Sequence, residues 1–558
     1  MKKSDYIRNE ALHTTRHAYP EKGFVAYNCY SIHGGHGNIP QQMIEDSLTA
    51  HGLGEDYYTL LDGYGTPKFP RYAIGEWGFS FLNLNGTYAG SGHQMHGSGW
   101  VVHSPKTDEE AVEIMRTWLY KQYTDEKHQL EEGEHGVAAI NGHTLFQHYA
   151  AEWGFDQIGS EIGENTGMHQ AHMAFTRGAG RQYGKLTIMD FSNWNAGTIG
   201  TWETKPSWPQ GSSTGGHSLS LLKRAYVMSY MGGASDFLFE VACLLSFIGE
   251  EAVDENGILL LSPYGKQVKE LLAFTADHRD IGIAYTPIGL VIDHYRGWAT
   301  CAVLEDGAGY RHDRALGCFP NTPGDDMVNA LFYLLYPGAS PFNWHDYFHQ
   351  APEQMAQVNN AYGDVFDYIT HKASQAVLDS YPVLVLCGDI DLTAEAAQRY
   401  IAYVQKGGTL LCNTAYLRFF ADYQAAYDAG AQTIPDGEGT VIVYGPDYSV
   451  EALDGLLKEQ IKKHVPFTLS DEVQYLVNVK DGSLILTLIN NEGVTKVCSE
   501  PPVIDESKAK TITVTYTGDE PVAQVKELYY GEPVDVDGNA VTVTVGPGDV
   551  QVLEFVFD

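Results

Sequence analysis

Three glutamates occupy positions at which the chain could carry out acid–base chemistry. Glu161 ends the strand-like run QIGSE, Glu164 follows three residues later, and Glu240 ends the run DFLFE. The period of two of a β-strand puts Gly159 on the face of Glu161 and Asp236 on the face of Glu240, and the small glycine leaves room for Glu161. Burial of such carboxyl groups is costly unless they are paired or used. Two facing carboxyl groups, one protonated and one ionised, are what hydrolysis of a glycosidic bond requires.

Each of these acids also has a structural interpretation. Glu164 lies at the start of the next helical stretch, where a carboxylate compensates the helix dipole, and Glu161 could form a loop salt bridge. Glu240 could pair with an arginine inside the fold. Asp190 and Glu76 are reserve candidates, because both lie next to predicted strands. We assign the chemistry to Glu161, Glu164 and Glu240.

Polar and aromatic side chains follow the ends of several predicted strands, in segments such as NCYSIHGGHGN, DFSNWN and IDHYRGW. Amides and carboxylates bind sugar hydroxyls, and aromatic faces stack on the C–H surface of a sugar ring. We therefore expect a carbohydrate pocket. Its substrate-binding residues are predicted to be His33, His36, Glu76, Trp100, Asn141, His143, Asn165, Asp190, Asn193, Trp194 and Trp298.

Three pairs of histidines have the spacing HxxH, which can bring two imidazoles together around a metal ion. They are His33 with His36, His93 with His96, and His169 with His172. The last pair lacks the glutamate of an HExxH motif, and the first two lie in glycine-rich loops. We expect neither a metal site nor a cofactor.

Between about residues 20 and 300, short β-rich runs alternate with helical stretches, as in parallel sheets and barrels. Eight candidate strands fit the count of a closed (β/α)8 TIM barrel, whose functional residues lie at the carboxyl ends of its strands. These candidates are Phe24–Asn28, Phe79–Leu84, Trp100–His103, Val137–Ile140, Gln157–Glu161, Leu186–Asp190, Asp236–Glu240 and Gly289–Asp293. The predicted helices are Asp108–His128, Thr166–Tyr183, Ser218–Met231 and Pro263–His278.

The rest of the chain has two further patterns. Val383–Leu386, Thr393–Gln405 and Thr409–Cys412 form a predicted β-α-β unit with glycines 407 and 408 after its helix. This unit predicts a flavodoxin/Rossmann-like α/β domain, and without GxGxxG we assign it no nucleotide. Alternating runs from about residue 465 predict a C-terminal β-sandwich. The predicted domains are residues 1–310, 311–455 and 456–558.

The composition excludes several classes of partner. A formal charge of −36 repels nucleic acids and anionic membranes, and no run of 18 apolar residues exists. Seven scattered cysteines are typical of buried thiols in a reducing compartment. The first residues, MKKSDYIRNEALHTT, have no apolar stretch of a signal peptide. We expect a cytoplasmic protein with a carbohydrate substrate; removal of a leader would make it secreted or periplasmic.

Three segments resemble barrel glycosidases of the family 42 β-galactosidase type. QIGSEIGEN is similar to the end of the fourth strand of such enzymes, SPYGKQVKEL to a helix start, and YVQKGGTLL to their run YVxxGGxLV. The resemblance implies a barrel, a flavodoxin-like trimerisation domain and a β-sandwich, in this order. It further implies an exo-acting hydrolase of glycosidic bonds and a homotrimer.

The resemblance fails at one decisive position. The family has an asparagine directly before its acid/base glutamate, whereas here Asn165 follows Glu164. Glu161 falls on the fourth strand only if Phe79–Leu84 is left out of the count; otherwise it falls on the fifth. We therefore predict a distant relative and carry over no β-galactoside specificity.

Several mechanisms remain open at this point. A retaining glycosidase with Glu161 or Glu164 as acid/base and Glu240 as nucleophile needs carboxyl groups about 5–5.5 Å apart, and an inverting one about 6.5–9.5 Å. A non-catalytic carbohydrate-binding protein on a degenerate barrel would have one central carboxylate. A lyase for acidic sugars would use basic residues, for which Arg177, Arg181 and Lys185 are candidates, although contact with the sheet or solvent suits them better.

Overall fold

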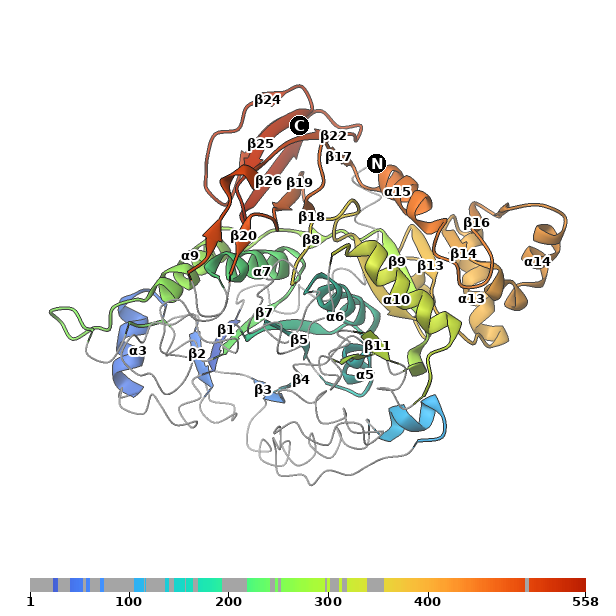
Figure 1. The fold of residues 1–558 in the computed structure, drawn as a ribbon, viewed down its shortest axis with the longest axis horizontal. Coiled ribbons are helices and arrows are strands. Elements are labelled where there is room, and N and C mark those ends of the chain that lie inside the picture. Colours follow the sequence, from blue (N-terminus) through green and yellow to red (C-terminus); the bar gives the residue numbers. More distant parts are fainter. Residues whose placement is uncertain are drawn as a thin grey trace.

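The computed structural model of the chain shows three groups of elements, with the C-terminal strands above α7 and α9 and the α/β sheet beside α6 (Figure 1). The structure describes residues 24–28, 41–53, 57–60, 71–74, 105–114, 116, 136–139, 145–155, 157–163, 169–192, 218–240, 246–248, 252–296, 299–301, 311–313, 319–338, 356–496 and 501–557. Helices, parallel sheets and antiparallel sheets all occur in it, so the predicted mixed α/β class is confirmed.

Seven parallel strands form the first sheet, in the order β2-β1-β7-β6-β5-β4-β3. They are β1 (Phe24–Asn28), β2 (Tyr57–Leu60), β3 (Arg71–Ile74), β4 (Gly136–Ala139), β5 (Gln157–Gly163), β6 (Leu186–Ser192) and β7 (Asp236–Glu240). Because β7 pairs with β1, the order follows the chain cyclically, as in a (β/α) barrel opened between β2 and β3. The described residues contain no pairing that closes it, and the eight-stranded barrel stays a prediction.

Five predicted strands of this sheet are confirmed, namely those that became β1, β4, β5, β6 and β7. Phe79–Leu84 and Trp100–His103 lie outside the described residues. Strands β2 and β3 were not predicted from the sequence. Each has only four residues, YYTL and RYAI, too few for a clear alternation of polar and apolar side chains.

The prediction that Gly289–Asp293 is a strand of the barrel is wrong. The segment is a strand, β9 (Ile288–Ile292), but it pairs with strands of the second sheet. All five of its residues are buried, which suits a central strand covered on both faces. The second sheet thus takes a strand from before the predicted boundary at residue 310, and the division into domains stays a prediction.

One face of the first sheet is covered by helices. Their bounds are α3 (Gln41–Ala50), α5 (Phe146–Glu152), α6 (His169–Tyr183), α7 (Leu219–Met231) and α9 (Pro263–Asp277). Helices α7 and α9 begin as predicted, because the hydroxyls of Ser218 and Ser262 accept hydrogen bonds from backbone N–H groups of the first turn. Of the predicted helix Asp108–His128, residues 108–114 are helical, and α6 starts three residues later than predicted.

The second sheet has the order β12-β9-β13-β14-β16-β15, in which only β15 is antiparallel to its neighbour. Its other strands are β12 (Phe366–Thr370), β13 (Val383–Leu386), β14 (Thr409–Cys412), β15 (Thr433–Asp436) and β16 (Gly439–Val443). Apart from β15, this is the flavodoxin-like order 2-1-3-4-5. The associated helices are α10 (Pro323–Leu335), α12 (Gln375–Leu378), α13 (Ala394–Gln405), α14 (Ala421–Asp428) and α15 (Leu453–His464).

The β-α-β unit predicted from the sequence is confirmed in detail. Thr393 caps α13 by accepting a hydrogen bond of 3.1 Å from the N–H of Ala396. Gly407 follows the helix with φ of 109°, a conformation that favours glycine. Cys387 and Cys412, at the ends of β13 and β14, are free and buried, as the sequence predicts for its thiols.

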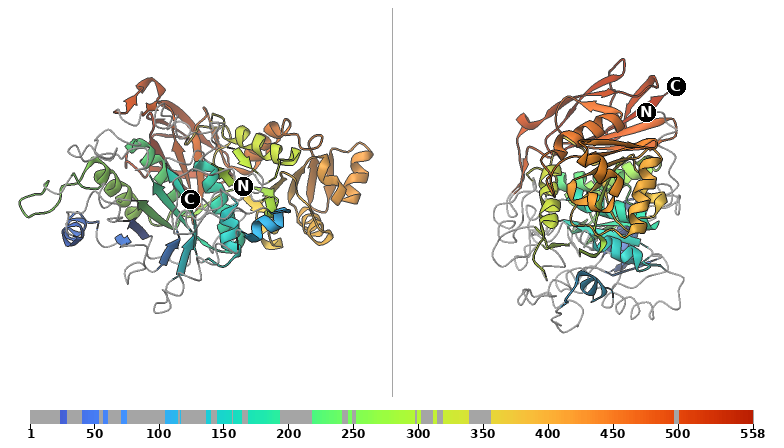
Figure 2. Two further views of the ribbon diagram at one scale, coloured as in Figure 1. Left: turned by 60° about the horizontal axis from the view of Figure 1, so that its bottom comes forward. Right: turned by 90° about the vertical axis from the view of Figure 1, so that its right-hand side faces the viewer.

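The C-terminal strands form two antiparallel sheets, β23-β26-β19-β18-β8 and β17-β22-β25-β24 (Figure 2). Their bounds are β8 (Ile283–Ala284), β17 (Phe467–Leu469), β18 (Gln474–Lys480), β19 (Ser483–Ile489), β22 (Lys510–Tyr516), β23 (Val522–Glu527), β24 (Val536–Asp537), β25 (Ala540–Val545) and β26 (Val550–Phe557). Because β8 directly precedes β9, one short segment joins this pair of sheets to the second sheet.

The described residues also form several smaller elements. They are the pairs β10 (Ala299–Cys301) with β11 (Arg311–Asp313) and β20 (Val494–Thr495) with β21 (Val503–Ile504), and the 3-10 helices η3 (His294–Arg296), η6 (Thr414–Phe419) and η7 (Glu506–Lys508). Among the helices that the structure describes, none combines the length and the apolar character needed to cross a bilayer.

Candidate functional site

Two carboxyl groups lie side by side near the carboxyl ends of β5 and β6. Glu161 of β5 and Asp190 of β6 are register partners, and register partners in a parallel sheet point to the same face. Each side chain is only 2% exposed. The first sheet therefore holds two neighbouring, buried acids at the end where (β/α) barrels place their functional groups.

The face on which these acids lie is the one opposite the helices. The alternate residue Ser160 points toward the helices, because its hydroxyl contacts Gln147 of α5 and Thr176 of α6. Phe237 and Phe239 of β7 likewise pack on Tyr226 of α7, with ring centroids 4.6 and 5.9 Å apart. Glu161 and Asp190 therefore point into the interior of the curved sheet.

The residues directly below the two acids on β5 and β6 are apolar and tightly packed. Gly159 shares the face of Glu161 and pairs with Ile188. A Cβ atom added to Gly159 would lie 2.2 Å from the carbonyl oxygen and 2.3 Å from Cγ2 of Ile188. The room expected beside Glu161 is thus filled by Ile188, and the glycine serves the close approach of β5 and β6.

The acid at the start of β7 has a structural partner. The side-chain amide of Gln157 on β5 donates a hydrogen bond to Oδ2 of Asp236, and both side chains are buried. The contact reaches across β6, which lies between the two strands. Asp236 is thereby satisfied at the amino end of its strand, away from Glu161.

Glu240 can be placed by its backbone. Asp190 pairs with Leu238, and Asn28 of β1 pairs with Glu240. Glu240 therefore ends β7 two residues beyond the level of Glu161 and Asp190, with β6 between the strands of the two glutamates. Its side chain lies outside the described part of the structure.

Most of the other predicted site residues also lie outside the described residues. They are Glu164, His33, His36, Glu76, Trp100, Asn141, His143, Asn165, Asn193, Trp194 and Trp298. Of the predicted constellation, the structure brings together Glu161 and Asp190, and the remaining assignments stay predictions. Among the histidines of the predicted HxxH pairs, His169 and His172 are described, and both are buried in α6. Within the described part of the chain, no three side chains of the kinds that ligate metals gather.

Two of the basic residues considered for a lyase, Arg177 and Arg181, form ion pairs with the second sheet. Arg177 Nε donates a hydrogen bond of 2.6 Å to Oδ1 of Asp367 on β12, and Arg181 donates to Oδ2 of the same carboxylate. The two arginines are 6% and 5% exposed. They hold α6 against the second sheet, whereas the sequence left contact with the sheet or with solvent open, and the lyase interpretation loses two of its three bases.

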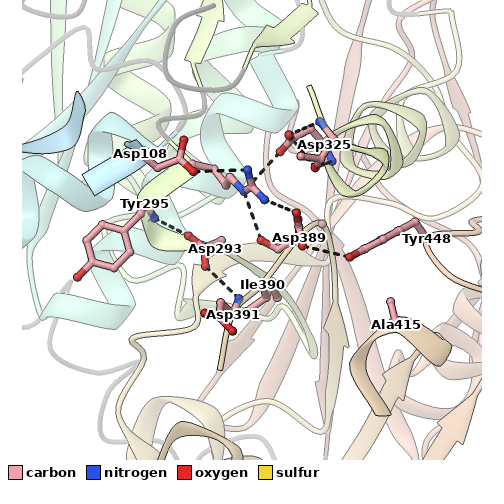
Figure 3. Close-up of polar contacts among 12 residues, drawn as sticks. Asp108, Asp293, Tyr295, Asp325, Asp389, Ile390, Asp391, Ala415 and Tyr448 are labelled. Carbon is pink, nitrogen blue, oxygen red and sulfur yellow. Dashed lines mark hydrogen bonds and ion pairs between the residues drawn. The ribbon is translucent and has the colours of Figure 1, made fainter. Parts of the chain in front are cut away.

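A second polar cluster lies at the carboxyl ends of β9 and β13, where flavodoxin-like sheets have their topological switch point (Figure 3). Arg296 lies at its centre. Its guanidinium forms an ion pair with Asp389 and lies 3.5 Å from a carboxylate oxygen of Asp108 and 3.8 Å from one of Asp325. Asp108 comes from the helical segment 108–114, so a segment from early in the chain supplies a carboxylate to this cluster.

The residues that contact β5 on its helix-facing side were not predicted from the sequence. Gln147 donates hydrogen bonds of 2.6 Å to the carbonyl oxygen of Gly159 and of 2.9 Å to the hydroxyl of Ser160. The Ser160 hydroxyl also lies 3.0 Å from that of Thr176. The one signal in the sequence is a glutamine inside the otherwise apolar and aromatic stretch LFQHYAA, which predicts a buried polar contact.

Comparison with known proteins shows a distant structural likeness. A catalytic mutant of a GH42 β-galactosidase from G. stearothermophilus is similar at 10% identity and a TM-score of 0.47, covering 92% of this chain and 81% of that one. A β-galactosidase from Bacillus circulans sp. alkalophilus is similar at 12% identity and a TM-score of 0.46, covering 80% and 68%. The apo exo-carrageenase GH42 from Bacteroides ovatus has 10% identity and a TM-score of 0.43, covering 100% and 79%.

No family model and no curated protein sequence matches the chain. The resemblance to family 42 enzymes that the sequence predicts is thus found again among solved structures, as a distant one. At these identities and TM-scores it transfers neither substrate nor mechanism, which have to be argued from the site.

Proposed function

We propose that the chain hydrolyses glycosidic bonds of an oligo- or polysaccharide, as an exo-acting, retaining enzyme with two catalytic glutamates. The observation that supports this most is the burial of Glu161 on the interior face near the carboxyl end of β5, in register with Asp190. Assembly as a homotrimer, which the family 42 resemblance implies, belongs to the same proposal.

Glu161 and Asp190 lie side by side as register partners, and both are buried. Two neighbouring carboxyl groups disfavour each other's charged form, so one of them tends to keep its proton while the other ionises. Two carboxyl groups held together away from bulk water are the arrangement that lets one act protonated and the other ionised. Hydrolysis of a glycosidic bond uses both states, one to protonate the leaving oxygen and one to attack or to activate water.

The roles follow from the positions along the strands. Glu161 is the acid/base in this proposal, with Glu164 as the alternative three residues later, and Glu240 is the nucleophile. The backbone of Glu240 lies two strands away from Glu161 and nearer the carboxyl edge, so a sugar seated on that edge would lie between them. Asp190, beside Glu161, would bind a sugar hydroxyl, and its charge would favour the protonated form of Glu161 that an acid needs.

The experiment is a screen of nitrophenyl glycosides of both anomers, followed by glutamine substitutions. Glu161→Gln and Glu240→Gln should each lower kcat by about 1000-fold while the circular dichroism spectrum is unchanged. Glu459→Gln, on the exposed face of α15, is the matched control and should keep full activity. Near-normal rates in either site variant would remove that residue from the mechanism.

Proton NMR of the first-formed sugar separates the two stereochemical courses. Retention of the anomeric configuration supports Glu240 as nucleophile, whereas inversion means that the second carboxylate activates water, which requires the wider carboxyl spacing. Binding of oligosaccharides without any hydrolysis would overturn the enzymatic proposal in favour of a carbohydrate-binding protein.

A further inference from the structure

The strand that carries Glu161 is held by side chains from two helices. On its helix-facing side, the amide of Gln147 donates to the carbonyl oxygen of Gly159 and to the hydroxyl of Ser160, at 2.6 and 2.9 Å. Thr176 contacts the same hydroxyl at 3.0 Å. Gln147, Ser160 and Thr176 are fully buried, so water does not compete for these hydrogen bonds.

Within the described residues, the pairing of β5 with its neighbour β4 reaches only as far as Ile158. The described pairing between the two strands consists of Ala138 with Gln157 and Ala139 with Ile158. The hydrogen bonds from Gln147 begin at the next residue, Gly159. The glutamine thus continues the anchoring of β5 toward its carboxyl end, where Glu161 lies.

The strand is also fixed on its other side. Glu161 pairs with Asp190 of β6, and Gly159 packs so closely on Ile188 that no Cβ atom would fit. Strand β6 pairs with β5 at Glu161, and Gln147 contacts Gly159 and Ser160, the two residues before Glu161, from the helix-facing side. These contacts restrict both sliding and twisting of this part of β5. A displacement of about 1 Å is enough to cost about 100-fold in rate at a catalytic group.

We propose that Gln147 is a positioning residue for the catalytic acid, which acts on the Glu161 carboxyl through the backbone of Gly159 and Ser160. The inference rests on the proposed function of Glu161. Gln147 lies on the opposite face of β5 and touches no substrate, so its removal should misplace the carboxyl group without removing any sugar contact.

The test compares two substitutions of buried glutamines. Gln147→Met keeps the length of the side chain and removes its donor. The matched control is Gln170→Met on α6, because Gln170 also makes two buried hydrogen bonds, to Asp364 at 2.9 Å and from the N–H of Val358 at 2.8 Å. Both variants should lose similar thermal stability. Only Gln147→Met should lower kcat, by about 10- to 100-fold, with KM within twofold of the wild type.

Two measurements make the result decisive. In the same assay, Glu161→Gln shows whether Glu161 is catalytic at all, so that failure of the proposed function is recognised separately. Crystal structures of the wild type and of both methionine variants should show the Glu161 carboxyl displaced by about 1 Å in Gln147→Met alone. An unmoved carboxyl group in Gln147→Met, or equal kcat losses in both methionine variants, would overturn the inference. The displacement of the carboxyl group tests the positioning role even if no glycoside is turned over.

Discussion

Replacement of Asp367 by asparagine should be among the most destabilising conservative changes in the chain. Asp367 lies fully buried on β12 and accepts hydrogen bonds from four side chains. Arg177 and Arg181 of α6 donate to it, as do the Thr286 hydroxyl at 2.7 Å and the Tyr381 hydroxyl at 2.9 Å. An asparagine keeps the shape but leaves two buried guanidinium groups without their counter-charge.

The magnitude follows from the burial. Loss of one partner from a buried ion pair costs about 3–5 kcal/mol, because the remaining charge stays desolvated. Unfolding entropy is about 2.1 cal/mol/K per residue, so for 558 residues unfolding as one unit a loss of about 4 kcal/mol lowers Tm by about 3 °C. Asp379→Asn is the control, because its partner Lys406 is 58% exposed and such surface pairs contribute about 0–1 kcal/mol.

The pH dependence gives the prediction a second readout. Burial acts against ionisation of Asp367, but the charges of Arg181 and Arg177 outweigh it and hold the pKa of Asp367 below its ordinary value. A lowered folded-state pKa means stability that is present above the unfolded-state pKa of about 3.9 and lost as the pH falls through the folded-state pKa. The difference in the free energy of unfolding between wild type and variant, measured in urea, should therefore have its full size at pH 7 and be smaller below about pH 4. A difference under about 1 kcal/mol at pH 7 would refute the reasoning.

Two further predictions concern the same junction. Burial raises the pKa of Asp364 to about 6 from 3.8, so the folded state binds the extra proton and unfolding free energy falls as pH rises between these values. The stability of the wild type relative to Asp364→Asn should thus fall by up to about 3 kcal/mol from pH 4 to pH 7 in urea titrations, and a pH-independent difference would contradict this. Gly178→Ala should cost about 3 kcal/mol, the upper end of the usual cost of overpacking, because its Cβ would lie 1.9 Å from the carbonyl oxygen of Tyr368. Calorimetry should show no such loss for Gly455→Ala, which has open space on α15, and equal effects would count against the clash.

The local part of the candidate site could be predicted from the sequence. The period of two along QIGSE and the position at the end of a run are properties of a few neighbouring residues, and they are enough to assign Glu161 to an interior face. Its partner could not be predicted in this way. Whether Asp190 lies beside Glu161 depends on which strands are neighbours and on their register, and these are set by long-range packing.

The elements of the fold likewise differ in how well the sequence predicts them. Capped and periodic helices such as α13 were predicted closely, because their start and stop signals are local. The run Ile288–Ile292 was recognised as a strand but assigned to the wrong sheet, since an apolar strand buried on both faces has the same sequence pattern in a barrel and in a doubly wound sheet. The glutamine in LFQHYAA predicts a buried polar contact, but a single glutamine in a helix does not reveal which backbone it supports, so the role of Gln147 could not be predicted.

Helix α6 connects the candidate site to the second sheet. Thr176 contacts Ser160, next to Glu161, and the following residue, Arg177, pairs with Asp367 of β12. A helix transmits a displacement along its length because its backbone hydrogen bonds keep it stiff. Any slip of α6 against β12 must therefore reach the strand that carries Glu161. The α/β sheet is in this sense connected, through α6, to the strand that carries the carboxyl group.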